Sequence, residues 1–268
     1  MTPLIFFILG LAIGSFLNVV VYRLRVAETL VSGRSHCPHC QSTIAWYDNI
    51  PVISFILLKF RCRSCQAKIS WQYPIVEVMT ALLFVLVGHY FFQETDLFSW
   101  ITAGYYLAML SCLVVILVYD FLYMEIPSIV LWSAIFGAIV FTLFIDGGRE
   151  IHAGMQITNF LTYSGLLAAT VAFSFFFAMV AVSKEKWMGM GDAYLVILLG
   201  LLTGWPNILL ALLLAFSIGA LTGIGLILAK KKKMGSQLPF APFLVLGTII
   251  TLFWYAPIAH WYLDLFMF

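Results

Sequence analysis

Two aspartates at the edges of apolar segments are the residues in this sequence best suited to catalysis. Asp120 closes the stretch LVVILVYD, and Asp192 follows Gly189 and Gly191 in GMGD, where another apolar stretch begins. Two neighbouring carboxyl groups can hydrolyse an amide without a metal, because one accepts a proton from water while the other donates a proton to the amide. Glycines beside such a site permit a sharp turn or the close approach of a substrate strand. The pattern therefore predicts a hydrolytic site with Asp120 and Asp192 as its acid and base.

The same residues have a structural interpretation of equal standing. Both aspartates can serve as helix caps or interfacial groups, and the glycines can simply form a turn, since GxGD is a short motif. A helix macrodipole favours the charged form of a carboxylate at the N-terminus and the neutral form at the C-terminus. If the two groups act together, we expect Asp192 to be the ionised partner and Asp120 the protonated one.

Four cysteines form a second candidate site. They occur as CPHC and CRSC with 21 residues between the pairs, and they are Cys37, Cys40, Cys62 and Cys65. Two such knuckles can supply four thiolates to a tetrahedral zinc ion, and a closed set of four favours a structural rather than a catalytic metal. Two disulfides, or reduced thiols without a metal, are the alternatives, and His36 or His39 could replace a cysteine as ligand.

The composition is that of an integral membrane protein. Of the 268 residues, 63% are hydrophobic and 10% are charged, whereas soluble domains carry about 25% charged residues. Apolar runs of a length that can cross a bilayer as helices occur at 3–22, 75–92, 100–119, 128–145, 158–182, 193–206, 208–229 and 241–263. The segment 49–58 (NIPVISFILL) is too short to span, so we expect it at the membrane interface or inside a small domain.

The basic residues predict the orientation of these spans. Of the 14 Lys and Arg residues, all except Arg149 fall in the loops 23–74, 120–127, 183–192 and 230–240. The positive-inside rule places those loops in the cytoplasm and both termini outside. No basic residue precedes the first apolar run, so it is predicted to be a retained helix rather than a cleaved signal peptide.

These observations predict an all-α integral membrane protein of about eight transmembrane helices with a small cytoplasmic zinc-binding loop domain. The expected domains are a first transmembrane helix (1–22), the zinc-binding loop (23–74) and a seven-helix membrane domain that carries both aspartates (75–268).

Six segments, in this order, resemble the type IV prepilin leader peptidases of bacterial pilus and type II secretion systems. They are GSFLNVVVYRL (14–24), the two CxxC pairs, YDNIPVISFILLKFRCRSC (47–65), ISWQYPIVEV (69–78), YDFLYMEIP (119–127) and GMGD (189–192). The resemblance implies a multi-pass aspartic endopeptidase of the bacterial inner membrane. Such an enzyme removes the basic leader of prepilins and pseudopilins after a glycine at the cytoplasmic face. It then methylates the new N-terminus with S-adenosylmethionine.

The resemblance also implies roles for particular residues. The catalytic positions fall on Asp120 and Asp192, and the zinc ligands on the four cysteines. Glu77 becomes a candidate contact for the methyl donor or the substrate amine, although it could equally be an interfacial acid paired with Lys68 or Arg23. Where many members have glycine, this chain has Ala81, which leaves a peptidase without methyltransferase activity as an alternative.

Two further departures from the family pattern do not touch the carboxylates. Ser128 stands where an acidic residue is frequent, and Tyr194 stands where a lysine is frequent. Both bear on substrate choice rather than on hydrolysis.

Other classes of protein are less consistent with the sequence. A transporter that uses the aspartates as a proton relay would place acids near the middle of the bilayer rather than at one edge. A non-catalytic scaffold would tolerate asparagine at both positions, and a zinc protease would carry HExxH. Lys230 to Lys233 directly follow an apolar run, so we interpret them as an anchor to anionic membrane lipid and not as a nucleic-acid site. The sequence does not predict the oligomeric state.

Overall fold

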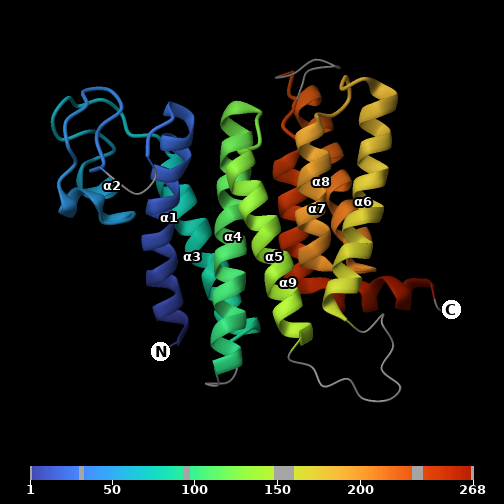
Figure 1. The fold of residues 1–268 in the computed structure, drawn as a ribbon. Coiled ribbons are helices and arrows are strands. Elements are labelled where there is room, and N and C mark those ends of the chain that lie inside the picture. The colour runs from blue at the N-terminus through green and yellow to red at the C-terminus, as the bar shows by residue number, and fades with distance from the viewer. Residues whose placement is uncertain (1, 30–32, 93–96, 148–159, 231–237, 267–268) are drawn as a thin grey trace. The chain divides into compact units, whose positions relative to one another are not determined.

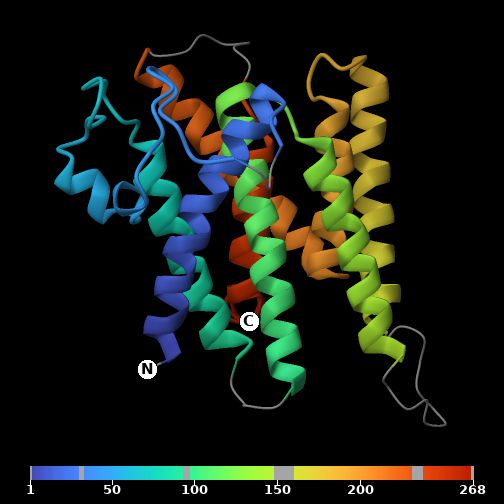
Figure 2. The same ribbon diagram turned by 60° about the vertical axis from the view of Figure 1, so that its left-hand side comes forward.

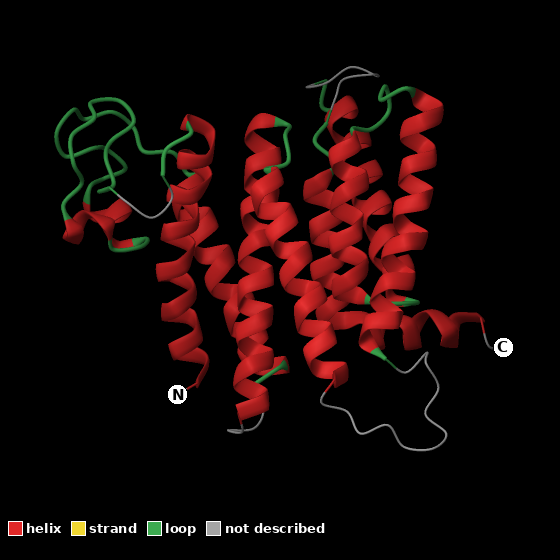
Figure 3. Ribbon diagram, in the orientation of Figure 1, coloured by secondary structure: helices red, strands yellow, loops and turns green. Residues whose placement is uncertain are grey.

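The computed structural model describes residues 2–29, 33–92, 97–147, 160–230 and 238–266. Figure 3 shows helices and loops throughout these residues and no strand. Packing divides the chain into two compact units, Met1–Val118 and Tyr119–Phe268. Both aspartates fall in the second unit, and the four cysteines fall in the first. The domain boundaries expected from the sequence follow topology rather than packing and stay a prediction.

The first unit contains the long helices α1 (Thr2–Val26), α3 (Gln72–Tyr90) and most of α4 (Leu97–Tyr123), with a small irregular module between α1 and α3 in the sequence (Figure 1). The module contains η1 (Trp46–Asn49) and α2 (Ile53–Leu57). Helices α1 and α3 are in very close contact, because a Cβ atom on Gly14 would lie 2.7 Å from the Cα atom of Glu77 and one on Gly10 would lie 2.5 Å from that of Ala81. Small residues allow this approach of two backbones within a membrane.

The second unit contains the end of α4 and the five helices that follow it. They are α5 (Ser128–Gly147), α6 (Leu161–Ser183), α7 (Met190–Thr203), α8 (Asn207–Leu228) and α9 (Ala241–Phe266). Helix α7 lies against α6 in Figures 1 and 2, and a Cβ atom on Gly200 would lie 2.5 Å from the backbone nitrogen of Ala169. None of the α7 residues is exposed.

Within the described residues, seven helices are long and apolar enough to cross a membrane, namely α1, α3, α4, α5, α6, α8 and α9. The remaining expected span corresponds to α7, which has 14 residues. The chain is therefore an all-helical, multi-pass membrane protein. Arg149 and Lys231 to Lys233, which entered the charge argument, lie outside the described residues.

Candidate functional site

Asp192 is held by the N-terminus of its own helix. Gly189 is the N-cap of α7, and Asp192 is the third helical residue after it. The Asp192 carboxylate accepts a hydrogen bond from the backbone N–H of Gly189, while the Asp192 N–H donates to the Gly189 carbonyl at 3.2 Å. This reciprocal pair satisfies an amide that would otherwise lack a partner, and it orients the carboxylate at the positive end of the helix.

Asp120 lies in the last turn of α4 and is almost fully buried, with 5% of its surface exposed. Its carbonyl accepts the N–H of Met124 at 2.8 Å, and Met124 ends the helix with a φ of 54°. Its carboxylate accepts a hydrogen bond from the backbone N–H of Ala241, the first residue of α9. Among the described residues, the buried Oδ2 atom has no hydrogen-bond partner.

The structure brings the two carboxylates into one neighbourhood within the second unit. Asp192 lies close enough to Asp120 for their charges to interact. The loop between α4 and α5 contributes to this approach, because a Cβ atom on Gly191 would lie 3.3 Å from Cδ1 of Ile126. A Cβ atom on Gly189 would meet little, since the nearest atom is 4.0 Å away. The backbone beside Asp192 is therefore open on the Gly189 side and packed on the Gly191 side.

The sequence predicted that one aspartate lies at the positive end of a helix and the other at the negative end, but the structure does not show this difference. Asp120 is at the C-terminus of α4, as the sequence suggested, but it also binds the N-terminus of α9. Each carboxylate thus faces the positive end of a helix, and the macrodipole argument cannot assign the acid and the base. The sequence analysis missed this contact because 121 positions separate Asp120 from Ala241.

The four cysteines come from two turns of the same construction. The N–H of Cys37 donates to the Ser42 carbonyl, and the N–H of Cys62 donates to the Ala67 carbonyl, at 3.0 Å and 2.9 Å. In each turn the glutamine after the second cysteine has a positive φ, 57° at Gln41 and 58° at Gln66. The sequences CPHCQ and CRSCQ therefore fold into matching knuckles whose sulfur atoms converge.

The geometry of the cluster fits a tetrahedral metal. All four Sγ atoms lie within 4.8 Å of one another, and those of Cys37 and Cys65 are 3.9 Å apart. Thiolates bound to zinc at about 2.3 Å stand about 3.8 Å apart around the tetrahedron. Hydrogen bonds from Ser42 lower the pKa of the Cys40 thiol to about 6, and those from the backbone of Cys65 and Ser64 lower the pKa of Cys62. These two shifts favour the thiolate form that a metal needs, whereas burial and the neighbouring cysteines raise the pKa of the Cys65 thiol to about 11.

The flanking histidine His36 is directed elsewhere. Its ring meets Tyr22 edge-on at 5.7 Å, and its Nε2 atom lies 4.0 Å from Oε1 of Glu28.

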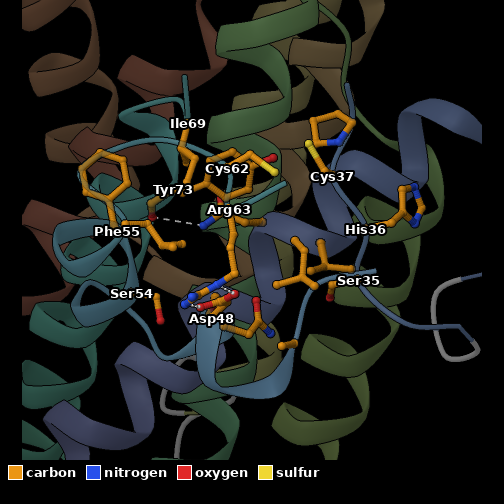
Figure 4. A pocket seen from close by; sticks show the side chains of 18 of the residues that line it. Ser35, His36, Cys37, Asp48, Ser54, Phe55, Cys62, Arg63, Ile69 and Tyr73 are labelled. Atoms are coloured by element: carbon orange, nitrogen blue, oxygen red, sulfur yellow. Dashed lines mark hydrogen bonds and ion pairs between the residues drawn. The ribbon is translucent and has the colours of Figure 1, made fainter. Parts of the chain in front are cut away.

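The second knuckle contains one member of an ion pair that the sequence analysis did not identify. Arg63 donates to both carboxylate oxygens of Asp48, at 2.6 Å and 2.7 Å (Figure 4). This pairing lowers the pKa of Asp48.

Glu77 is buried between α1, α3 and the module. Its Oε2 atom accepts the backbone N–H of Val52 at 2.8 Å, and Ser15 also donates to the carboxylate. Glu77 is part of the wall of a cavity of about 510 Å³ in the first unit, which Arg23 and Lys68 also line. Figure 4 shows part of this wall. A cavity of this size can hold a small molecule.

The fold and sites define a class: a polytopic membrane protein with an aspartate pair at helix ends and a four-cysteine module. Comparison with known families is more specific. Residues 8–91 match the bacterial peptidase A24 N-terminal domain, and residues 107–224 match the type IV leader peptidase family. The first match contains the four cysteines and Glu77, and the second contains both aspartates.

Curated relatives match along nearly the whole chain. The chain is 34% identical to the prepilin leader peptidase/N-methyltransferase of Aeromonas hydrophila, over 97% of this chain and 93% of that protein. It is 31% identical to the protein of the same name in Bacillus subtilis (strain 168), over 97% and 98%. It is 34% identical to the type 4 prepilin-like proteins leader peptide-processing enzyme of an Escherichia coli strain, over 91% of each. No solved structure matches the chain.

This chain therefore belongs to the type IV leader peptidase family and is an enzyme of a protease family.

Proposed function

We propose that this protein is a bifunctional prepilin-processing enzyme, in which an aspartate pair cleaves the leader and a separate site in the first unit methylates the product. The observation that carries the proposal is the joint placement of Asp120 and Asp192 at helix termini in the second unit, where their charges interact. Relatives that match more than nine-tenths of the chain bear names with both activities.

The two aspartates would catalyse the hydrolysis as general base and general acid. One carboxylate takes a proton from water as the water oxygen adds to the scissile carbonyl carbon. The other carboxyl gives its proton to the leaving nitrogen when the carbon–nitrogen bond breaks. The buried, unpartnered Oδ2 of Asp120 is available for such a proton. Because the two groups interact, they titrate as a pair.

The substrate is a prepilin or pseudopilin, which presents a basic leader followed by an apolar helix. We propose that the cleavage site enters beside Gly189, where the backbone is open, and that the apolar part of the substrate stays in the membrane. The distribution of basic residues supports a site at the cytoplasmic face of the inner membrane, which is also the face proposed for the cysteine module.

The methyl donor, S-adenosylmethionine, is assigned to the cavity of about 510 Å³ in the first unit. When bound, this compound supplies an electrophilic methyl group. The lining offers groups of the required kinds, with arginines for a carboxylate, tyrosines for an adenine ring and Glu77 for a cationic centre; they include Arg23, Arg34, Tyr22, Tyr47 and Glu77. Because Val52 and Ser15 already donate to Glu77, its carboxylate is fixed in orientation.

The four-cysteine cluster would hold one structural zinc ion. Cys37 and Cys62 line the same cavity as Glu77. A metal that joins the two knuckles would therefore set the shape of the cavity, and it leaves no open position for chemistry.

The test uses purified protein in detergent with a prepilin and labelled S-adenosylmethionine. Asp120→Asn and Asp192→Asn should each abolish leader removal, whereas Asp264→Asn, at an exposed position of α9, should not. Both asparagine variants should still methylate a substrate whose leader has already been removed. Cleavage that survives either substitution would show that this aspartate is not catalytic, and a wild-type protein that does not cleave would favour the transporter or scaffold interpretation. A wild-type protein that cleaves without methylating would reduce the proposal to a peptidase.

A further inference from the structure

The short helix α2 carries an apolar face that no described residue covers. Three of its five residues are exposed, by 56% at Ile53, 59% at Ile56 and 76% at Leu57. The other two, Ser54 and Phe55, are buried. Trp71, at the start of α3, is 63% exposed and packs edge-on against Phe55 at 5.1 Å. A soluble module would rarely present such a group of large apolar side chains to water.

The depth of α2 along α1 indicates what covers this face. Ser15 and Val52 donate to the same Glu77 carboxylate, so α2 begins beside the Ser15 level of α1. Arg23, in the last turn of α1, is eight residues further on, which corresponds to about 12 Å at 1.5 Å per residue. Figures 1 and 2 show α2 alongside α1 rather than beyond its end. A helix that spans the membrane up to Arg23 therefore holds α2 below the level of the lipid headgroups.

A second cavity agrees with this position. Asn49 and Pro51 line a cavity that extends along α1 from Ala12 to Arg23. Ala12 is eleven residues before Arg23, about 16 Å along the helix. The residues that lead into α2 thus lie alongside α1 and not beyond its C-terminal end.

Backbone N–H groups at the start of α2 have hydrogen-bond partners within the protein and do not need water. The N–H groups of Val52, Ile53, Ser54 and Ile56 all donate within the protein, and Pro51 has none. Non-helical backbone at membrane depth requires such pairing. Glu77 contributes to this pairing, because its carboxylate accepts the N–H of Val52, the residue before α2.

The apolar face also continues into a lipid-facing surface and ends in cations. On α3, Ile75, Val78 and Leu82 follow Trp71 at helical spacing and are exposed. Lys59 and Arg61 come directly after α2 and are exposed. An apolar face followed by basic residues is typical of segments that lie in a membrane interface and attract anionic lipid.

We propose that α2 is an interfacial anchor, which inserts Ile53, Ile56 and Leu57 into the acyl region of the leaflet at the Arg23 end of α1. The insertion of α2 would thereby hold the irregular module that contains the four cysteines against the membrane. This inference goes beyond the proposed catalytic function and does not depend on either activity.

The test is photocrosslinking of the full chain in nanodiscs that hold one copy and an alkyne-tagged anionic phospholipid. The photoreactive amino acid p-benzoyl-L-phenylalanine replaces Leu57, Leu82 on the exposed face of α3, or Lys68 on the exposed part of the second knuckle. Lipid labelling at Leu57 should resemble that at Leu82 and exceed that at Lys68 by at least about fivefold. Replacing the alkyne-tagged anionic phospholipid by an alkyne-tagged zwitterionic phospholipid should reduce the labelling at Leu57 more than that at Leu82.

The experiment separates lipid from other occupants of this face. Nanodiscs with two copies, or with added prepilin, would reveal a protein partner as a crosslinked band of higher mass. If such a band replaces lipid labelling at Leu57, the face is a protein-docking surface and the proposal is wrong. Labelling at Leu57 as low as at Lys68 would place α2 in water and would also overturn it.

Discussion

The carboxylate of Asp120 accepts the backbone N–H of Ala241, so the end of α4 and the start of α9 meet at one buried charge. No side chain is involved on the α9 side, because the donor is the backbone amide of Ala241. An amide fixed in a helix N-terminus does not reorganise when the charge on the carboxylate changes. In the proposed mechanism, this contact would hold the carboxylate of Asp120 in one orientation.

The contact can be tested by removing the amide hydrogen. Ala241→Pro deletes the donor at the first helical position, where proline is compatible with a helix. A hydrogen bond to a charged group contributes about 1.5–3 kcal/mol, so we expect the rate of leader cleavage to fall by roughly 10- to 100-fold. Ala241→Gly keeps the amide and is the control. Equal rates in the two variants, measured at matched thermal stability, would show that the amide has no role in cleavage.

The glycines of GMGD should differ in their tolerance of alanine. Gly189 has an extended backbone, with a φ of −78°, and open space where a Cβ atom would lie. Gly189→Ala should therefore leave the melting temperature nearly unchanged, but it should raise the KM for prepilin if the substrate strand passes there.

At Gly191 the alanine methyl group would instead press on Ile126. Gly191→Ala should lower both stability and the cleavage rate, and Ile126→Val should restore part of the loss. A normal KM for Gly189→Ala would move the substrate path away from this glycine.

Removal of the metal should affect the two activities unequally. We expect about one zinc ion per chain by elemental analysis, because four thiolates form one tetrahedral site. Cys62→Ser should lose the metal and the methyl transfer, since Cys62 also lines the cavity in the first unit. Leader cleavage in the second unit should be retained to a much larger extent. If cleavage and methylation fall in parallel, the module would be needed for the stability of the whole protein.

The Arg63 and Asp48 pair should control how tightly the metal is retained. Arg63→Lys preserves the charge but cannot form the two parallel hydrogen bonds to Asp48. We expect zinc release to a chelator to accelerate severalfold, with little change in melting temperature because Arg63 is exposed. Lys68→Arg, at an exposed position near the same knuckle, is the matched control. Identical release rates would show that the ion pair does not brace the cluster.

The close contact between α1 and α3 gives a prediction about stability. Gly14→Ala would place a methyl group 2.7 Å from the Cα atom of Glu77, and neither backbone can yield without separating the helices. Overpacking of this kind costs about 1–3 kcal/mol. Gly104→Ala, where no atom lies within 4 Å, should be neutral or stabilising. Thermal unfolding in one detergent compares the two variants, and equal melting temperatures would contradict the observed packing.

Local features of the fold could be read from the sequence. The long apolar runs became helices, and the CxxC spacing placed four sulfur atoms within 4.8 Å. Both depend on neighbouring residues or on a simple repeated turn. The resemblance to prepilin peptidases was confirmed by the family matches.

Features that depend on distant contacts could not be predicted. Segment 49–58 was ambiguous because its position depends on the bond between Val52 and Glu77, and Val52 adopts a φ of 60° that valine rarely takes. The second partner of Asp120 required knowledge of where α9 begins. The roles of Asp120, Asp192 and Glu77 in catalysis stay predictions.

The shortness of α7 has a consequence for how the enzyme responds to its membrane. Fourteen residues extend about 21 Å, which is less than the hydrocarbon thickness of about 30 Å. Since its residues are buried or half-buried, α7 packs mainly against protein, and the length requirement that hydrophobic mismatch imposes on lipid-facing helices acts on it less than on its neighbours. Changes in bilayer thickness should therefore act on the tilt of the outer helices, while the helix that begins at the GMGD motif keeps its length and position. If cleavage takes place at the start of α7, we expect its rate to change little between membranes whose lipid chain lengths differ.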